Sequence, residues 1–95
     1  MYDSKTKSAD VDSLYENILK LQTVEECYKF FDDLCTISEI HSFAQRLAVA
    51  KLLYKGETFN VIAEQTGAST ATISRVNRCL QYGSDGYKTV LSREG

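Results

Sequence analysis

Proline is absent from this 95-residue sequence, and glycine occurs only five times. Proline breaks helices most strongly and glycine comes next, so their scarcity favours an all-α chain. No apolar run approaches the roughly 20 residues that a membrane-spanning helix needs. No apolar stretch follows Lys5 and Lys7, as it would in a secretory signal. We therefore expect a protein of the cytoplasm, with no membrane partner.

Reactive side chains are also scarce. Cys27, Cys35 and Cys79 are odd in number and lack the close pairing of a zinc site, so we expect reduced cysteines. Cys27 and Cys35 lie on an apolar stripe and are interpreted as core residues; a redox switch is the alternative. The single histidine, His41, adjoins Ser42, but no nucleophile elbow, P-loop or zinc-protease motif is present. The sequence thus predicts no catalytic residue, no metal site and no enzyme activity.

The net charge of −2 hides a gradient along the chain. Residues 1–35 hold eight acids and four lysines, whereas residues 36–83 hold three acids and five bases. A mildly positive second half is compatible with nucleic-acid binding and does not by itself establish it.

Apolar periodicity and capping signals predict six helices in one domain spanning 1–95. A flexible N-terminal arm over 1–9 precedes the first helix, which begins near Asp10 and carries Val11, Leu14, Ile18 and Leu21 on one face. Thr23 with Glu26, and Thr36 with Glu39, form capping boxes for the next two helices. The expected helices are about 10–21, 24–35, 37–55, 58–66, 69–82 and 85–92.

The helix over 37–55 is apolar on more than one face. A helix of that kind must be buried on two sides, and a chain this short has little core to spare. We therefore expect a homodimer, with 10–55 and 84–92 forming the dimer core. Gly56 is predicted to end this helix.

Residues 58–82 carry the main functional pattern, a helix-turn-helix. Ala63 is small where two helices cross, and Gly67 permits the positive φ of the tight turn. Ile62, Ala68, Ile73 and Val76 stand at inward spacings, with Thr66 at a semi-polar inward site. Ser69 or Thr70 is the expected cap of the second helix. A glycine-linked helical hairpin that only packs is the alternative interpretation.

The outward positions of the second helix suit DNA. Hydroxyls can bond phosphates or base edges, a methyl can touch thymine, and arginine can grip guanine. The predicted reading surface is Ser69, Thr70, Ala71, Thr72, Ser74, Arg75 and Arg78.

From about residue 34 the chain resembles the bacterial tryptophan repressor family, in the subgroup known as YerC/YecD. The matching stretches are 36–39, 46–57 and 67–75. The resemblance implies a six-helix fold, an intertwined homodimer in which the first three helices and the last interlock, and a DNA-reading head. The segment 56–67 is one residue shorter than in the tryptophan repressor.

The resemblance also implies a ligand pocket at Thr36, Arg46, Arg75 and Cys79. Arg46 could bind a carboxylate and Arg75 could stack on a planar ring. Thr36 as a helix cap, and the arginines as partners of a carboxylate or a phosphate, are the alternatives. Val76 stands where the family keeps a glycine beside the ligand, and Cys79 replaces a serine. Both departures count against L-tryptophan, so another small effector, or none, stays open.

Together these observations predict a transcriptional regulator that binds double-stranded DNA. A symmetric dimer would place two recognition helices in successive major grooves, about 34 Å apart, on a palindromic operator. The resemblance to the family implies that the protein represses transcription. The alternative is a protein-interaction adaptor that uses the same helices, and Arg78 with the Ser/Thr-rich helix start distinguishes the two.

Overall fold

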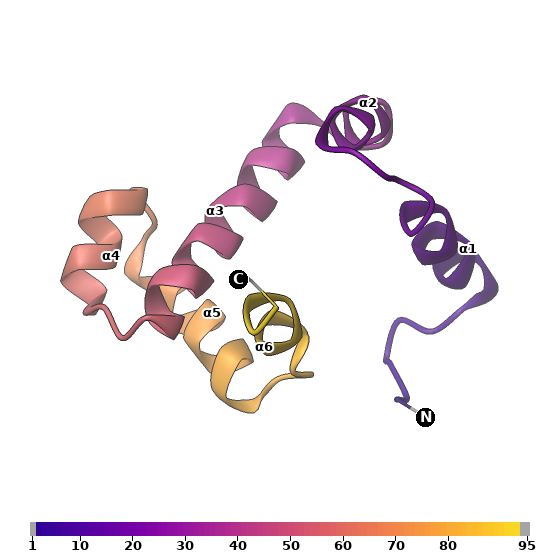
Figure 1. The fold of residues 1–95 in the computed structure, drawn as a ribbon. Helices are drawn as coiled ribbons and strands as arrows, with labels where there is room; N and C mark the ends of the chain where they lie inside the picture. Colours follow the sequence, from indigo (N-terminus) through magenta and orange to yellow (C-terminus); the bar gives the residue numbers. More distant parts are fainter. Residues whose placement is uncertain (1, 94–95) are drawn as a thin grey trace. The chain divides into compact units, whose positions relative to one another are not determined.

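The computed structural model describes residues 2–93, and this part of the chain contains six helices and no strand (Figure 1). It divides into two compact units, one ending at Thr36 and one starting at Ile37, which are described separately. The predicted division into an arm, a dimer core and a reading head stays a prediction. The helices are α1 (Ala9–Ile18), α2 (Val24–Leu34), α3 (Ile37–Tyr54), α4 (Phe59–Thr66), α5 (Thr70–Tyr82) and α6 (Gly86–Leu91).

Both helices of the first unit begin with a hydroxyl cap. The Ser8 hydroxyl accepts a hydrogen bond from the Val11 amide at 3.1 Å, so α1 begins one residue before the predicted start. Thr23 accepts from the Glu26 amide at 3.0 Å. The Glu26 carboxylate in turn accepts from the Gln22 amide at 2.8 Å. In a usual capping box the partner is the amide of the N-cap residue, here Thr23, which is one residue later in the chain.

One prediction for the first unit is wrong. Leu21 was placed on the face of the first helix, but α1 ends at Ile18 and the Leu21 amide bonds back to the Ile18 carbonyl in a following turn. Cys27 and Cys35, which we expect to be core residues, are half-buried in the single chain, and their place in a dimer core stays a prediction. Neither α1 nor α2 contains a buried residue, so this unit has no core of its own in the single chain.

The second unit contains the buried core. α3 packs against α4, α5 and α6, and α5 also contacts α4 and α6 (Figure 1). The side chains at the centre are aliphatic or alanine, and none of the described polar or charged residues is buried. The buried core residues are Val49, Ala50, Ile62, Ala68, Ile73, Val76, Leu80 and Leu91.

The end of α3 follows the predicted glycine cap. Gly56 has a φ of +90°, its amide bonds to the Leu53 carbonyl at 3.0 Å, and the Glu57 amide bonds to the Leu52 carbonyl at 3.0 Å. This pair of bonds is a Schellman motif, which needs a residue with positive φ after the helix. It redirects the chain into α4, so Gly56 sets where the helix-turn-helix begins.

Candidate nucleic-acid interface

α4 and α5 form a helix-turn-helix that packs against α3 (Figure 1). The predicted inward residues are confirmed, because Ile62, Ala68, Ile73 and Val76 are all at most 5% exposed. Ala63 is half-buried and packs against this core, as a small residue at a helix crossing should. The burial of one side of each helix fixes which side of α5 remains outside.

The turn between α4 and α5 combines a glycine with a threonine. Gly67 has a φ of +71°, and its amide bonds to the Ala63 carbonyl at 2.9 Å, which closes the end of α4. The Thr66 hydroxyl donates to the Ile62 carbonyl at 2.7 Å and accepts from the Ala68 amide at 3.1 Å. The sequence pattern placed Thr66 inward, and the structure adds that its hydroxyl links the two sides of the turn.

Ser69 is the residue that caps α5, which decides between the two predicted caps. Its hydroxyl accepts from the Thr72 amide at 3.1 Å and lies 3.1 Å from the Thr72 hydroxyl. Capping satisfies one amide of the first helical turn, and the others stay available to a ligand such as phosphate. The start of α5 is thereby held in a defined conformation before any partner binds.

The predicted reading surface is largely accessible. Thr72 is half-buried, and the remaining six residues, Ser69, Thr70, Ala71, Ser74, Arg75 and Arg78, are exposed. α5 carries two arginines and no acidic residue, and its first turn has the positive end of the helix dipole. Short hydroxyl side chains at the start of α5 would let its backbone approach a binding partner closely, while the longer arginine side chains would contact more distant groups. These features fit a groove lined with phosphates.

The four predicted ligand residues have different surroundings. Thr36 is exposed, and Arg46 is half-buried with its guanidinium carbon 5.9 Å from the centre of the Phe43 ring. Arg75 and Cys79 are exposed and lie four residues apart on α5, so they share a face. The role of these four residues as a ligand site stays a prediction.

Val76 follows Arg75 on α5 and, unlike Arg75 and Cys79, points into the core. It is 2% exposed and belongs to the buried cluster that joins α3, α4 and α5. Its side chain therefore fills space at the place where the resembled family keeps a glycine. This packing does not fit a planar ligand inserted beside the helix at that point.

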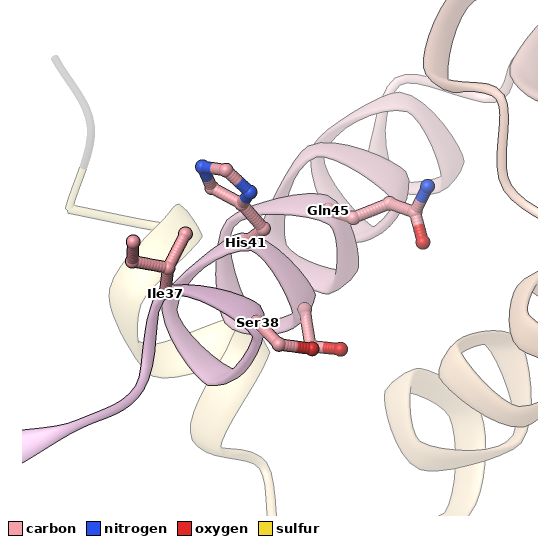
Figure 2. Close-up of a pocket in the computed structure, with 5 residues that line it drawn as sticks. Ile37, Ser38, His41 and Gln45 are labelled. Carbon is pink, nitrogen blue, oxygen red and sulfur yellow. The ribbon is translucent and has the colours of Figure 1, made fainter.

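A shallow hollow of about 570 Å³ lies elsewhere, along the first half of α3 (Figure 2). It contains hydroxyl, imidazole and amide groups beside one aliphatic side chain. None of the four predicted ligand residues lines it. The lining residues are Ile37, Ser38, His41, Ser42 and Gln45.

Gln45 is the structurally important residue that the sequence analysis missed. Its side-chain amide donates to the Thr66 carbonyl at 3.3 Å, and the bond is partly buried. The two residues are 21 positions apart, so no local pattern could have indicated the pair. Figure 2 shows the Gln45 amide extending away from Ile37 and His41.

Residues 2–93 contain neither a membrane-spanning helix nor a cluster of metal-binding side chains. No helix there has the length and apolar character to cross a membrane. Across the same residues, no three histidine, cysteine, aspartate or glutamate side chains gather into a group that could hold a metal ion.

The chain was compared with known proteins. The family model described as Trp repressor protein matches residues 9–95. The uncharacterized protein YerC of Bacillus subtilis (strain 168) is 56% identical over 93 residues, covering 98% of this chain and 89% of YerC.

Two solved structures are similar over 94% of this chain. A crystal structure of a candidate Trp repressor from Staphylococcus aureus has a TM-score of 0.90 and 54% identity, with 89% of that chain covered. A TrpR-like protein from Eubacterium eligens has a TM-score of 0.90 and 55% identity, with 92% covered. The resemblance predicted from the sequence is thus confirmed: the chain belongs to the Trp repressor family of all-α DNA-binding regulators.

Proposed function

We propose that this protein is a sequence-specific transcriptional repressor that binds a palindromic operator as a homodimer. The observation that carries the proposal is the outer face of α5. It presents hydroxyls, one methyl and two arginines, with no acidic residue on the helix, at the end of a helix-turn-helix. Such a helix can contact base edges while its N-terminus meets phosphate. Repression is expected because a dimer bound near a promoter blocks the polymerase.

The homodimer is supported by apolar side chains that the single chain leaves uncovered. α1 and α2 have no buried residue, although both are amphipathic. Contiguous exposed apolar surface on a small protein marks a site of association. The large apolar side chains of the first unit that are at least half exposed are Tyr2, Tyr15, Leu19, Val24, Tyr28 and Leu34. A second copy of the chain is the simplest partner that could bury these side chains. A dimer with two-fold symmetry requires a palindromic operator.

We further propose that operator binding does not require L-tryptophan. Val76 is buried against α3 and α4, so the chain's own side chain supports α5 from the inner side. Introducing a ligand there would require Val76 to move, and rearranging a well-packed core costs about 1–3 kcal/mol. Regulation by another small effector, or by protein concentration alone, is consistent with this packing.

The deciding experiment selects fragmented genomic DNA on the purified full-length protein, with and without added L-tryptophan. We expect one palindrome to be enriched to the same extent in both arms. Enrichment only with tryptophan would show an aporepressor and contradict the role given to Val76. Enrichment in neither arm would contradict the DNA-binding function and favour the adaptor interpretation, in which the same helices bind a protein.

A further inference from the structure

Hydrogen bonds within α4 and the turn hold the helix-turn-helix locally, whereas the Thr66 carbonyl accepts its bond from α3. The Thr66 hydroxyl satisfies the Ile62 carbonyl and the Ala68 amide, and the Gly67 amide bonds to Ala63. All of these bonds stay within α4 and the turn. They fix the shape of the turn, and they leave the orientation of the turn against α3 to other contacts.

Gln45 supplies a polar contact between the turn and α3. Its amide reaches from the middle of α3 to the Thr66 carbonyl, at the last residue of α4 and directly before Gly67. Apolar packing between α3 and α5 through residues such as Val76 is non-directional, so it resists separation more than it resists a change of angle. A hydrogen bond has strict requirements of distance and angle, so it restrains direction as well.

From this geometry we infer that Gln45 is a positioning residue, which fixes the angle at which α5 leaves the turn by holding the Thr66 carbonyl against α3. Gln45 itself touches no DNA in this scheme. Only one consequence of the inference rests on the proposed function: the angle of α5 would decide how accurately the two recognition helices of a dimer fit the two half-sites of the operator. The hydrogen bond itself can be tested on the free protein.

The test uses the full-length protein with Gln45→Met, which keeps the length of the side chain and removes the donor. Gln45→Asn is a second variant, because it keeps the amide but is one methylene too short to reach Thr66. The matched control is Gln22→Met, the same change at an exposed glutamine in the other unit. Hydrogen exchange of the Gly67 and Ala68 amides is measured without DNA, and affinity is measured on the selected operator and on unrelated DNA.

We expect faster exchange at Gly67 and Ala68 in both Gln45 variants, with α3 and the rest of α5 unchanged. Operator affinity should fall by at most about tenfold, because the operator must then hold the turn at the binding angle, and that costs no more than the hydrogen bond was worth. Affinity for unrelated DNA should stay near that of the parent, because phosphate contacts tolerate a change of angle. The tolerated half-site spacing should broaden. Gln22→Met should match the parent in every measurement.

Three results would overturn the inference. The first is unchanged exchange at Gly67 and Ala68, whatever the DNA results. The second is parent-like operator affinity and half-site spacing in both variants. The third is an equal loss of operator and unrelated-DNA binding together with a lower melting temperature, which would give Gln45 a general structural role. If the parent binds no DNA, the proposed function fails, and the exchange measurement alone decides whether Gln45 holds the turn.

Discussion

Short hydroxyl side chains begin α1, α2, α4 and α5. Ser8, Thr23, Thr58 and Ser69 each accept a hydrogen bond from the amide three residues further on, at 3.0–3.3 Å. Such a cap contributes about 1 kcal/mol to the helix that it begins. Ser69 differs from the others because its hydroxyl also lies beside Thr72, on the proposed reading surface. At this position one side chain both stabilises the helix and belongs to the surface that we propose for DNA binding.

Thr66 is the single residue whose hydroxyl matters most to the turn. Thr66→Val keeps the shape but removes the partner of the Ala68 amide and of the Ile62 carbonyl. We expect the free energy of unfolding to fall by about 1–3 kcal/mol, since a partly buried donor is left unpaired. Urea denaturation measures this change. Thr89→Val is the control, because its hydroxyl also bonds the carbonyl four residues back but is exposed, so a loss as large there would contradict the argument.

Gly83 and Gly86 make a second matched pair. A Cβ atom at Gly83 would lie 2.4 Å from the Cys79 carbonyl oxygen, whereas a Cβ at Gly86 meets nothing within 4 Å. Gly83→Ala should therefore destabilise the protein by more than about 1 kcal/mol, and Gly86→Ala should stabilise it by about 0.4–1 kcal/mol. Thermal unfolding compares the two. Equal melting temperatures would mean that the backbone at Gly83 relaxes without cost.

At the scale of the helices, most boundaries could be predicted from the sequence because their signals are local. Thr23, Gly56 and Gly67 act within four residues of themselves, and apolar spacing gave the inward residues of α4 and α5. The end of α1 was missed because Leu19 and Leu21 continue the apolar pattern past Ile18, with no glycine to mark the stop. Gln45 was missed for a different reason: its partner lies 21 residues away, so its role exists only in three dimensions.

The outer face of α5 gives a prediction about that helix as a unit. Arg78→Ala should weaken operator binding by about 1–3 kcal/mol if the guanidinium reads a base. Thr72→Ala should also weaken it. Neither change should lower the melting temperature by much, because Arg78 is exposed and Thr72→Ala removes only a hydroxyl from a half-buried side chain. Fluorescence anisotropy on the selected operator and thermal unfolding measure the two effects.

The control for Arg78 is Arg93→Ala, which removes the same charge at an exposed site after α6. It should leave operator affinity close to that of the parent. Parent-like binding by both Arg78→Ala and Thr72→Ala would mean that the reading surface lies elsewhere, or that the helices serve a protein partner.

At the scale of the whole molecule, the exposed apolar side chains of α1 and α2 make association the expected route to stability. We predict that the melting temperature rises with protein concentration, as mass action requires when folding and dimerisation are coupled. Leu34→Lys introduces a charge at a half-exposed apolar position and should shift the protein toward monomer. Sedimentation measures the shift.

Asp33→Lys is the neighbouring control, at an exposed polar position of the same helix. It should stay dimeric at the concentration where Leu34→Lys dissociates. A monomeric parent protein with a concentration-independent melting temperature would contradict the homodimer.

The absence of buried residues in α1 and α2 has a consequence for biosynthesis. Residues 2–36 leave the ribosome before the residues that form the core of the second unit. Leu19, Val24 and Leu34 are thus uncovered throughout translation, as they are in the finished single chain. We therefore expect the nascent protein to bind chaperones that hold apolar segments, and we expect its yield to depend on how soon a second copy of the chain pairs with it.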